Sequence, residues 1–330
     1  MPFSKWREII FCEGCGSLNN GRKIAEGGAL LALYSILLFL TVQVPFLGAV
    51  LLFFLPVPFI LTAVKQKLTW SIGFLFAACL LAALFGTIFA IPMALITGLT
   101  GITIGYLLKR DKPAFIIYIS AVLTFLAGVL VLYGVSVWFL GINYLQDFTE
   151  VLRESIDKSF EIMTAIGQEP QESVQKSLYA SIDMLDTILP ALLIVSSMVM
   201  VALFFLASHP ILKRFSERKV SWSPLRELQL PKSLLWYYLI TMITTYFLKP
   251  EENSFFFMAV ANLLVILQLL MLLQGYSLLF FFSYIKGWAK PVPITILVIS
   301  LFLPLFQSII RILGILDLGF SFRETLQKKK

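Results

Sequence analysis

Cysteine and histidine are the usual ligands of a structural zinc site, and this sequence has three cysteines and one histidine. Cys12 and Cys15 have the spacing of half a zinc site, which needs four ligands. The other candidates are Cys79, inside an apolar run, and His209, far along the chain. Because a second pair of ligands is missing, we interpret Cys12 and Cys15 as reduced cytosolic thiols and expect no cofactor.

The usual catalytic motifs are absent from the sequence. It has neither the GxxxxGK[ST] phosphate loop nor the HExxH motif. His209 has no obvious nucleophile or acid beside it in the sequence. We therefore expect that the protein is not an enzyme and does not hydrolyse nucleotide itself.

Three amides in one late apolar run are candidates for a functional or a packing role. Asn262, Gln268 and Gln274 follow one another at intervals of six residues. Each interval turns about 240° on a helix, so that the three side chains point in different directions instead of lining one pore. Amides in membrane helices often form hydrogen bonds between helices, and we favour that packing role.

Charged side chains reappear at the end of the last apolar run. Gln307 and Arg311 are four residues apart and share one helical face, and Asp317 and Arg323 follow them. An ion pair at the membrane boundary is the simpler interpretation. A contact with a partner protein is the alternative.

Composition indicates the elements that must position these residues. Apolar residues make up 59% of the chain and charged residues 14%, and the mean hydropathy is +0.89. These values are typical of a chain surrounded largely by lipid. We expect an all-α, polytopic integral membrane protein with eight or nine transmembrane helices. Its net charge of +7 comes from bases in short loops, so we expect a bilayer as its partner and no nucleic acid.

An acidic segment, residues 141–187, separates two blocks of nearly uncharged sequence. It carries nine acids against three bases, whereas the other long loops are basic. Because basic loops stay in the cytoplasm, we place this segment outside. Gly167 can end one helix and Pro170 can open the next, which predicts a helical hairpin. Its two apolar stripes, expected to pack together, are Phe148, Leu152, Ile156 and Phe160, and Val174, Leu178, Ile182, Leu185 and Leu189.

The spacing of apolar runs and charges predicts the order of the domains. Residues 69–108 contain no charge and are long enough for two short crossings, broken near Gly86. The next apolar run has neither proline nor charge before Asp147, which favours a helix that continues into the acidic segment. We expect a cytoplasmic N-terminal segment (1–27), a membrane block of about five spans (28–140), the extracytoplasmic helical hairpin (141–187), a membrane block of three or four spans (188–316) with a basic cytoplasmic loop (209–232), and a basic C-terminal tail (317–330).

The side of the C-terminus stays open at this point. Nine crossings from a cytoplasmic N-terminus place the three terminal lysines outside, against the usual distribution of bases. The last apolar segment is interrupted by Pro304, and one solution is that it turns back there without crossing. The other is that a short tail tolerates the unusual side.

Five stretches together carry a family resemblance. They are IAEGGALLALYSILL, LGAVLLFFLPVPFIL, SPLRELQLPKSLLWYYL, ANLLVILQLLMLLQGYSLLFFF and LGILDLGFSFR, spread in order over most of the chain. They resemble the YybS-like family of bacterial multi-pass membrane proteins, which implies a location in the bacterial cell membrane. The matching positions are Glu26, Pro56, Pro58, Pro231, Asn262, Gln274, Gly275, Gly314, Asp317 and Arg323.

The N-terminal half is also similar to the substrate-capture components of energy-coupling-factor transporters. That similarity implies a solute-binding transport component that lacks its own ATPase and works with other membrane proteins or a separate coupling ATPase module. The three spans after Lys232 and the acidic hairpin depart from this pattern. They keep an alternative open, a non-transporting membrane scaffold or regulator that recruits cell-envelope or division partners.

Overall fold

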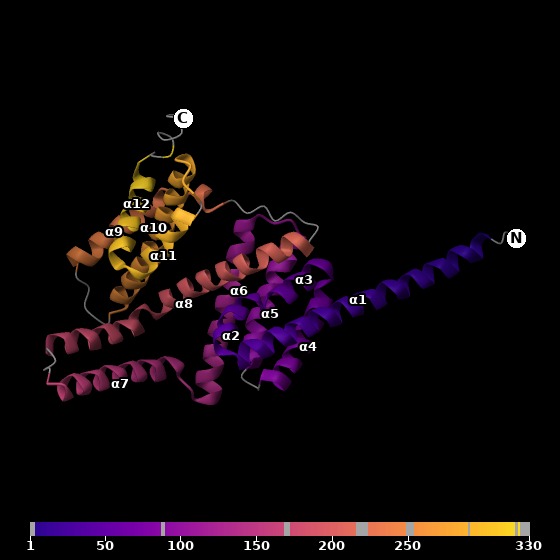
Figure 1. Cartoon of the computed structure of the whole chain (residues 1–330), viewed down its shortest axis with the longest axis horizontal. Helices are drawn as coiled ribbons and strands as arrows, with labels where there is room; N and C mark the ends of the chain where they lie inside the picture. Colours follow the sequence, from indigo (N-terminus) through magenta and orange to yellow (C-terminus); the bar gives the residue numbers. More distant parts are fainter. Residues whose placement is uncertain are drawn as a thin grey trace. The chain divides into compact units, whose positions relative to one another are not determined.

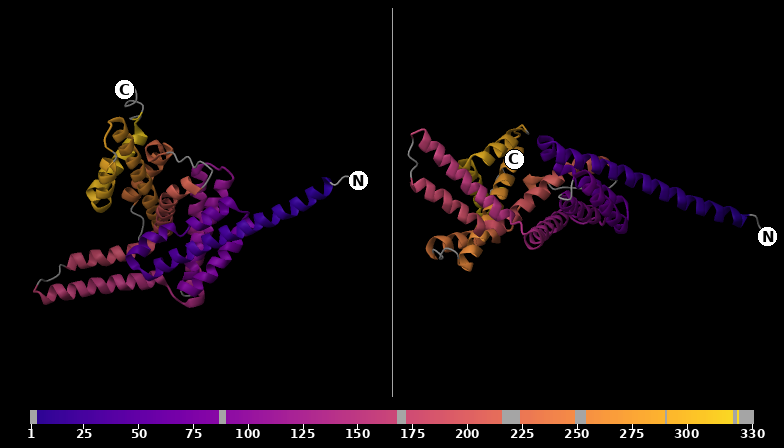
Figure 2. Two further views of the ribbon diagram at one scale, coloured as in Figure 1. Left: turned by 45° about the vertical axis from the view of Figure 1, so that its right-hand side comes forward. Right: turned by 90° about the horizontal axis from the view of Figure 1, so that it is seen from below.

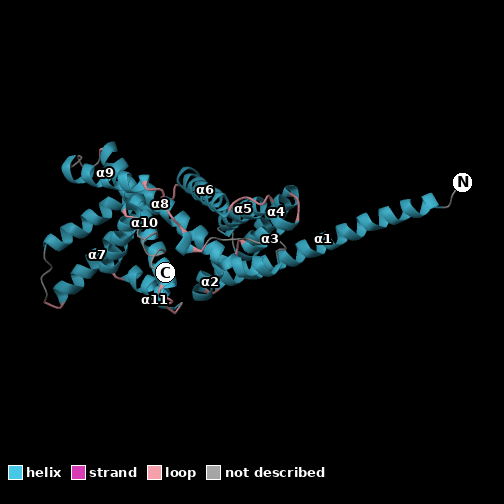
Figure 3. Ribbon diagram, turned by 90° about the horizontal axis from the view of Figure 1, so that it is seen from above, coloured by secondary structure: helices cyan, strands magenta, loops and turns pink. Residues whose placement is uncertain are grey.

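The structure is a computed structural model that describes residues 4–86, 90–167, 172–215, 224–248, 254–289, 291–320 and Arg323. Within these ranges every regular element is a helix (Figure 3), which confirms the expected all-α fold. The α-helices are α1 (Ser4–Gln43), α2 (Pro45–Leu51), α3 (Val57–Lys65), α4 (Leu68–Gly86), α5 (Ala90–Lys109), α6 (Ala114–Val135), α7 (Tyr144–Ala165), α8 (Glu172–Phe215), α9 (Ser233–Leu248), α10 (Phe255–Ile285), α11 (Pro291–Phe302) and α12 (Pro304–Gly319).

The apolar helices are long enough for a polytopic membrane protein. Seven helical segments of the described chain could cross a bilayer by length and composition, and the bent pair α11 and α12 would be an eighth. The shorter apolar helix α9 corresponds to the remaining expected span. The structure thus contains the apolar segments behind the expected eight or nine crossings.

The chain forms two compact units, which we call the N-terminal and C-terminal units. The N-terminal unit contains residues up to Ile142 and the second part of α8, from Ser197 onward. The C-terminal unit contains Asn143–Ser196 and the chain from Trp222 to the end. The acidic hairpin therefore belongs to the same unit as α9–α12.

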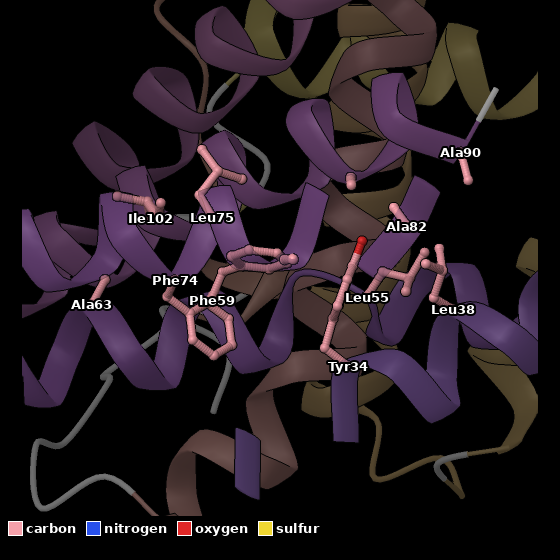
Figure 4. Close-up of a cluster of buried hydrophobic side chains, with 12 residues drawn as sticks. Tyr34, Leu38, Leu55, Phe59, Ala63, Phe74, Leu75, Ala82, Ala90 and Ile102 are labelled. Atoms are coloured by element: carbon pink, nitrogen blue, oxygen red, sulfur yellow. The ribbon is translucent and has the colours of Figure 1, made fainter. Parts of the chain in front are cut away.

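Aromatic and small side chains build the core of the N-terminal unit (Figure 4). Phe59 of α3 lies edge-on to Tyr34 of α1 and to Phe74 of α4, with ring centroids 5.0 and 5.2 Å apart. On α5, Gly101 lets that helix approach α3 closely, because an added Cβ would lie 2.7 Å from the Pro56 carbonyl oxygen. Most of the small residues on α4 and α5 therefore serve packing inside this unit.

Two helix boundaries bear on the sequence predictions. The charge-free run divides into α4 and α5 on either side of residues 87–89, close to the expected break at Gly86. The prediction that the next helix continues into the acidic segment is wrong. After α6 the chain makes a π-helical turn, Ser136–Leu140, and Gly141 then adopts a φ of 66° before α7 begins. Glycine adopts this left-handed conformation without the cost that a side chain would add.

The acidic segment folds as the two helices of a hairpin, α7 and the first part of α8 (Figures 1 and 2). Arg153 of α7 forms an ion pair with Asp183 of α8, and Tyr179 donates a hydrogen bond to Asp157. The two apolar stripes are only partly covered, since Ile182 is buried whereas Phe148 is exposed. Gly167 follows α7 with a φ of 81°, and Pro170 lies outside the described residues.

α10 is the central helix of the C-terminal unit. Its neighbours α9 and α12 share a core with it that is formed by Tyr238, Leu267, Met271 and Leu318. α11 and α12 are bent by 119° at the break before Pro304. This bend is the structural counterpart of the interruption predicted at Pro304.

Candidate functional site

A buried polar cluster lies where α10 and α12 meet in the C-terminal unit, and we call it the Gln274–Asp317–Arg323 cluster. Gln274 of α10 is only 1% exposed. Its side-chain amide donates to the Asp317 carboxylate of α12 at 2.5 Å and accepts from the backbone N–H of Leu230 at 3.0 Å. One amide thus joins α10, α12 and the chain that precedes α9.

Arg323 completes the cluster from beyond the end of α12. Its side chain is 7% exposed and that of Asp317 is 2% exposed. The guanidinium donates through Nε and Nη2 to the Asp317 carboxylate, with its shortest bond at 2.7 Å. It also donates to the Arg226 carbonyl at 2.9 Å and to the Ser277 hydroxyl at 3.0 Å. Arginine suits this position because its planar fork can donate to several acceptors at once.

The cluster supplies hydrogen-bond partners for residues 224–232, a stretch without regular structure apart from the 3-10 turn Leu225–Glu227. The Ser277 hydroxyl lies 2.7 Å from the carbonyl oxygens of both Leu225 and Leu228. The hydroxyl has one proton, so it donates to one of these two carbonyls at a time. Arg323 and Gln274 bond to two further backbone groups of the stretch, the Arg226 carbonyl and the Leu230 N–H. Backbone groups that are buried against other parts of a protein need hydrogen-bond partners of this kind. We therefore interpret the cluster as a fixed joint between this stretch, α10 and α12.

Two glycines allow the helices of this joint to touch. A Cβ at Gly275 of α10 would collide with the Ile310 carbonyl oxygen, and one at Gly314 of α12 would collide with that of Met271. Both residues matched the family pattern. Their role is the close helix approach that small residues permit in membranes.

The chemistry of the cluster is that of a closed ion pair. Its carboxylate is occupied by a guanidinium and an amide, and both side chains are almost inaccessible. An ion pair of this kind is costly to break, because removal of one partner leaves a buried charge uncompensated. Asp317 and Arg323 thus form a buried ion pair, and the arrangement favours positioning of the chain over catalysis.

Asn262 serves a second joint of the C-terminal unit, between α10 and α8. Its amide donates to the Thr187 carbonyl and accepts from the Ala191 N–H, both at 2.7 Å. In an unbroken helix those two backbone groups would bond to each other. Pro190 lies between them and has no N–H of its own. The Asn262 amide therefore bridges the backbone of α8 at its proline.

The remaining polar candidates of α10–α12 stay outside these two joints. Gln268 is half-buried on α10, and we find no hydrogen bond from its amide to another described residue. Gln307 donates to the Leu301 carbonyl at 3.1 Å. Arg311 lies within α12, and its buried Nε has no hydrogen-bond partner among the described residues. The sequence analysis considered these residues together with Asn262, Gln274, Asp317 and Arg323, but in the structure they do not share hydrogen-bond partners with them.

A groove in the N-terminal unit contains the candidate Glu26. Its volume is about 510 Å³, and its lining is apolar apart from Glu26 of α1 and Lys65 of α3. These two side chains form an ion pair at 3.7 Å. Pro56 and Pro58 are buried at the start of α3, where they fix the entry of the helix that forms one wall. The groove is of the size that small-molecule sites usually have.

The sequence analysis did not identify several residues that contribute hydrogen bonds to the Gln274–Asp317–Arg323 cluster. Ser277 gave no signal because serine is common in membrane helices, and the carbonyl of Arg226 has no signature at all. Pro224 and Pro231, near the two ends of the stretch, are the signal that could have located it.

As for metal binding, the described residues contain no group of three or more His, Cys, Asp or Glu residues able to hold an ion. The side chains of Cys12 and Cys15 lie outside the described part.

Comparison with known proteins is consistent with this picture. Residues 32–318 match the family described as "Predicted membrane protein (DUF2232)". The uncharacterized protein YybS of Bacillus subtilis is 30% identical over 309 residues, which cover 93% of this chain and 99% of that protein. No solved structure matches the chain. The chain therefore belongs to the DUF2232 family of predicted membrane proteins and is a YybS-like protein.

Proposed function

We propose that the protein is a solute-binding component of a transporter in the bacterial cell membrane, with its N-terminus in the cytoplasm, and that separate ATPase subunits energise it. The observation that carries the proposal is the groove beside Glu26 and Lys65, an open site of about 510 Å³ in the N-terminal unit. The chain itself contains no phosphate loop. A capture component without its own ATPase combines these two properties, and we propose no enzymatic activity for it.

A partner subunit needs a surface on which to dock, and α1 offers one. Gly28 and Ala32 lie one turn apart on an exposed face of α1, and an added Cβ at Gly28 would meet nothing within 4 Å. By contrast, Gly101 and Gly105 of α5 are already covered by α3. The small-residue face of α1 is thus available for close approach of another membrane helix.

The test is purification of the tagged full-length protein from its native membrane in mild detergent, followed by mass spectrometry of the proteins that accompany it. We expect a transmembrane coupling subunit and paired ATPases. Gly28→Leu should reduce their recovery because it fills the docking face. Gly73→Leu is the matched control, since Gly73 of α4 is also helical and open. Recovery of cell-envelope or division proteins without any ATPase would overturn the proposal.

A scaffold that recruits such envelope or division partners is the second candidate, and the hairpin favours it. Phe148, Val151 and Ile162 of α7 are each more than half exposed among acidic neighbours. Apolar side chains beside acids suit a partner with basic and apolar groups. Deletion of the hairpin distinguishes the two functions, because a scaffold would lose its partners whereas a capture component would keep its coupling ATPases.

A further inference from the structure

The groove of the N-terminal unit has one charged pair and an otherwise apolar lining. It is formed by α1, by the chain from Phe54 to Lys65, and by the end of α8 at Ile211. Glu26 and Lys65 form its one charged position. The apolar part of the lining consists of Ala29, Leu30, Leu33, Leu37, Phe54, Val57, Leu61 and Ile211.

The charged pair lies at one end of the groove. On α1 the lining runs from Glu26 toward Leu37, and on the other wall it runs from Lys65 back to Phe54. Lys65 is the last residue of α3, where a transmembrane helix meets the membrane surface. Eleven residues of helix on α1 give the groove a length of about 16 Å. Its apolar part therefore extends from this charged end along two hydrophobic helices.

This lining restricts the chemical class of the ligand. The apolar part offers no side-chain hydroxyl or amide, so the hydrogen-bonding groups of a sugar, an amino acid or a nucleoside would be left unsatisfied there. Burial of such groups without partners is unfavourable, because they lose their hydrogen bonds to water. A flexible hydrocarbon chain fits the same space without that cost.

The two charges restrict the head group. Glu26 and Lys65 are 35% and 42% exposed, so both can be reached by a ligand from the open end. A purely anionic or cationic head group would meet one attractive and one repulsive charge. A zwitterionic head group can place its ammonium beside Glu26 and its phosphate beside Lys65.

We propose, as an extension of the proposed function, that the solute of this groove is a zwitterionic phospholipid, held by one acyl chain between α1 and α3 and by its phosphoethanolamine head at the charged pair. The bilayer itself supplies such a ligand laterally. The binding step involves no covalent change.

The experiment uses the purified full-length chain in mild detergent and measures binding of fluorescent lysophosphatidylethanolamine. Leu33→Trp should weaken binding at least about tenfold, because the indole occupies space that several methylene groups would fill. Ile36→Trp is the matched control on α1, since Ile36 is 58% exposed and does not line the groove, whereas Leu33 is 43% exposed and does. Equal affinity of both variants and the parent protein would overturn the proposal and indicate annular lipid only.

The head group is tested by a second comparison. Lysophosphatidylethanolamine should bind more tightly than a monoacylglycerol with the same chain, and Glu26→Gln with Lys65→Gln should remove that preference. The exchanged pair Glu26→Lys with Lys65→Glu should keep it, because both charges remain. No preference in the parent protein would overturn the assignment of the head group.

The outcome can be separated from that of the proposed function. Groove-specific binding in a protein that brings no ATPase through purification would leave the lipid site in place and end the transporter proposal. Recovery of the ATPases with no effect of Leu33→Trp on lipid binding would support the transporter proposal and overturn the lipid site.

Discussion

At the scale of single residues, Arg323 shows how one side chain fixes three pieces of the C-terminal unit. Its guanidinium contacts Asp317 of α12, Ser277 of α10 and the carbonyl of Arg226. Lysine at this position would carry the charge on one nitrogen, without the separate Nε, Nη1 and Nη2 groups through which Arg323 reaches its acceptors. The identity of the residue therefore matters beyond its charge.

We expect Arg323→Leu and Asp317→Leu each to destabilise the protein by about 3 kcal/mol, because each leaves a buried charge unpaired. The double variant should cost less than either single variant, since it removes both charges. Thermal unfolding of the purified variants in detergent measures the differences. If the double variant instead loses as much stability as the two single variants together, Asp317 and Arg323 are not energetically coupled. Their ion pair would then not stabilise the protein.

At the scale of elements, the α8–α10 joint places the amide of Asn262 beside Pro190, a residue of α8 that cannot donate a backbone hydrogen bond. Pro190 interrupts the hydrogen bonding of α8, and the Asn262 amide of α10 occupies the adjacent backbone positions at Thr187 and Ala191. A single amide with one donor side and one acceptor side matches the pair of backbone groups that it bridges. The joint thus fixes the depth at which the two helices pack.

Asn262→Leu should therefore lower stability by about 1 kcal/mol, the scale of hydrogen bonds between membrane helices. Gln268→Leu on the same helix is the control, because Gln268 forms no hydrogen bond to another described residue and should change stability less. Both are measured by melting in detergent. An unaltered melting curve for Asn262→Leu would mean that the Asn262 hydrogen bonds do not stabilise the contact between α8 and α10.

Helices were more predictable than contacts in this chain. Long charge-free runs specify helices because lipid leaves the backbone no other partner, and so the division into α4 and α5 near Gly86 followed from the sequence. The π-helical turn at Ser136–Leu140 did not, since nothing in its composition opposes a helix. Similarly, Asp317 and Arg323 stood out as charges, but their contacts with Ser277 and the Arg226 carbonyl depend on irregular backbone that no periodicity describes.

At the scale of the whole molecule, the cluster bears on the side of the C-terminus. Arg323, near the end of the chain, contacts the carbonyl of Arg226, which lies in the loop expected in the cytoplasm. The bend of 119° between α11 and α12 provides the return path that such a contact needs. We infer that α11 and α12 re-enter without crossing, which leaves the terminal lysines on the cytoplasmic side with the other bases.

Cysteine labelling tests this topology. In a background with Cys12, Cys15 and Cys79 replaced by alanine, Lys330→Cys and Lys232→Cys should both react with a membrane-impermeant maleimide only after the cytoplasmic side is opened. Ser155→Cys in the acidic hairpin should react in intact cells, because basic and acidic loops are expected on opposite sides. Reaction of the Lys330→Cys variant in intact cells, together with the hairpin cysteine, would mean that the last pair of helices crosses the membrane. The Arg323 contact with the loop before α9 could not then persist in the bilayer, and the positive tail would be a true exception to the charge distribution of the rest of the chain.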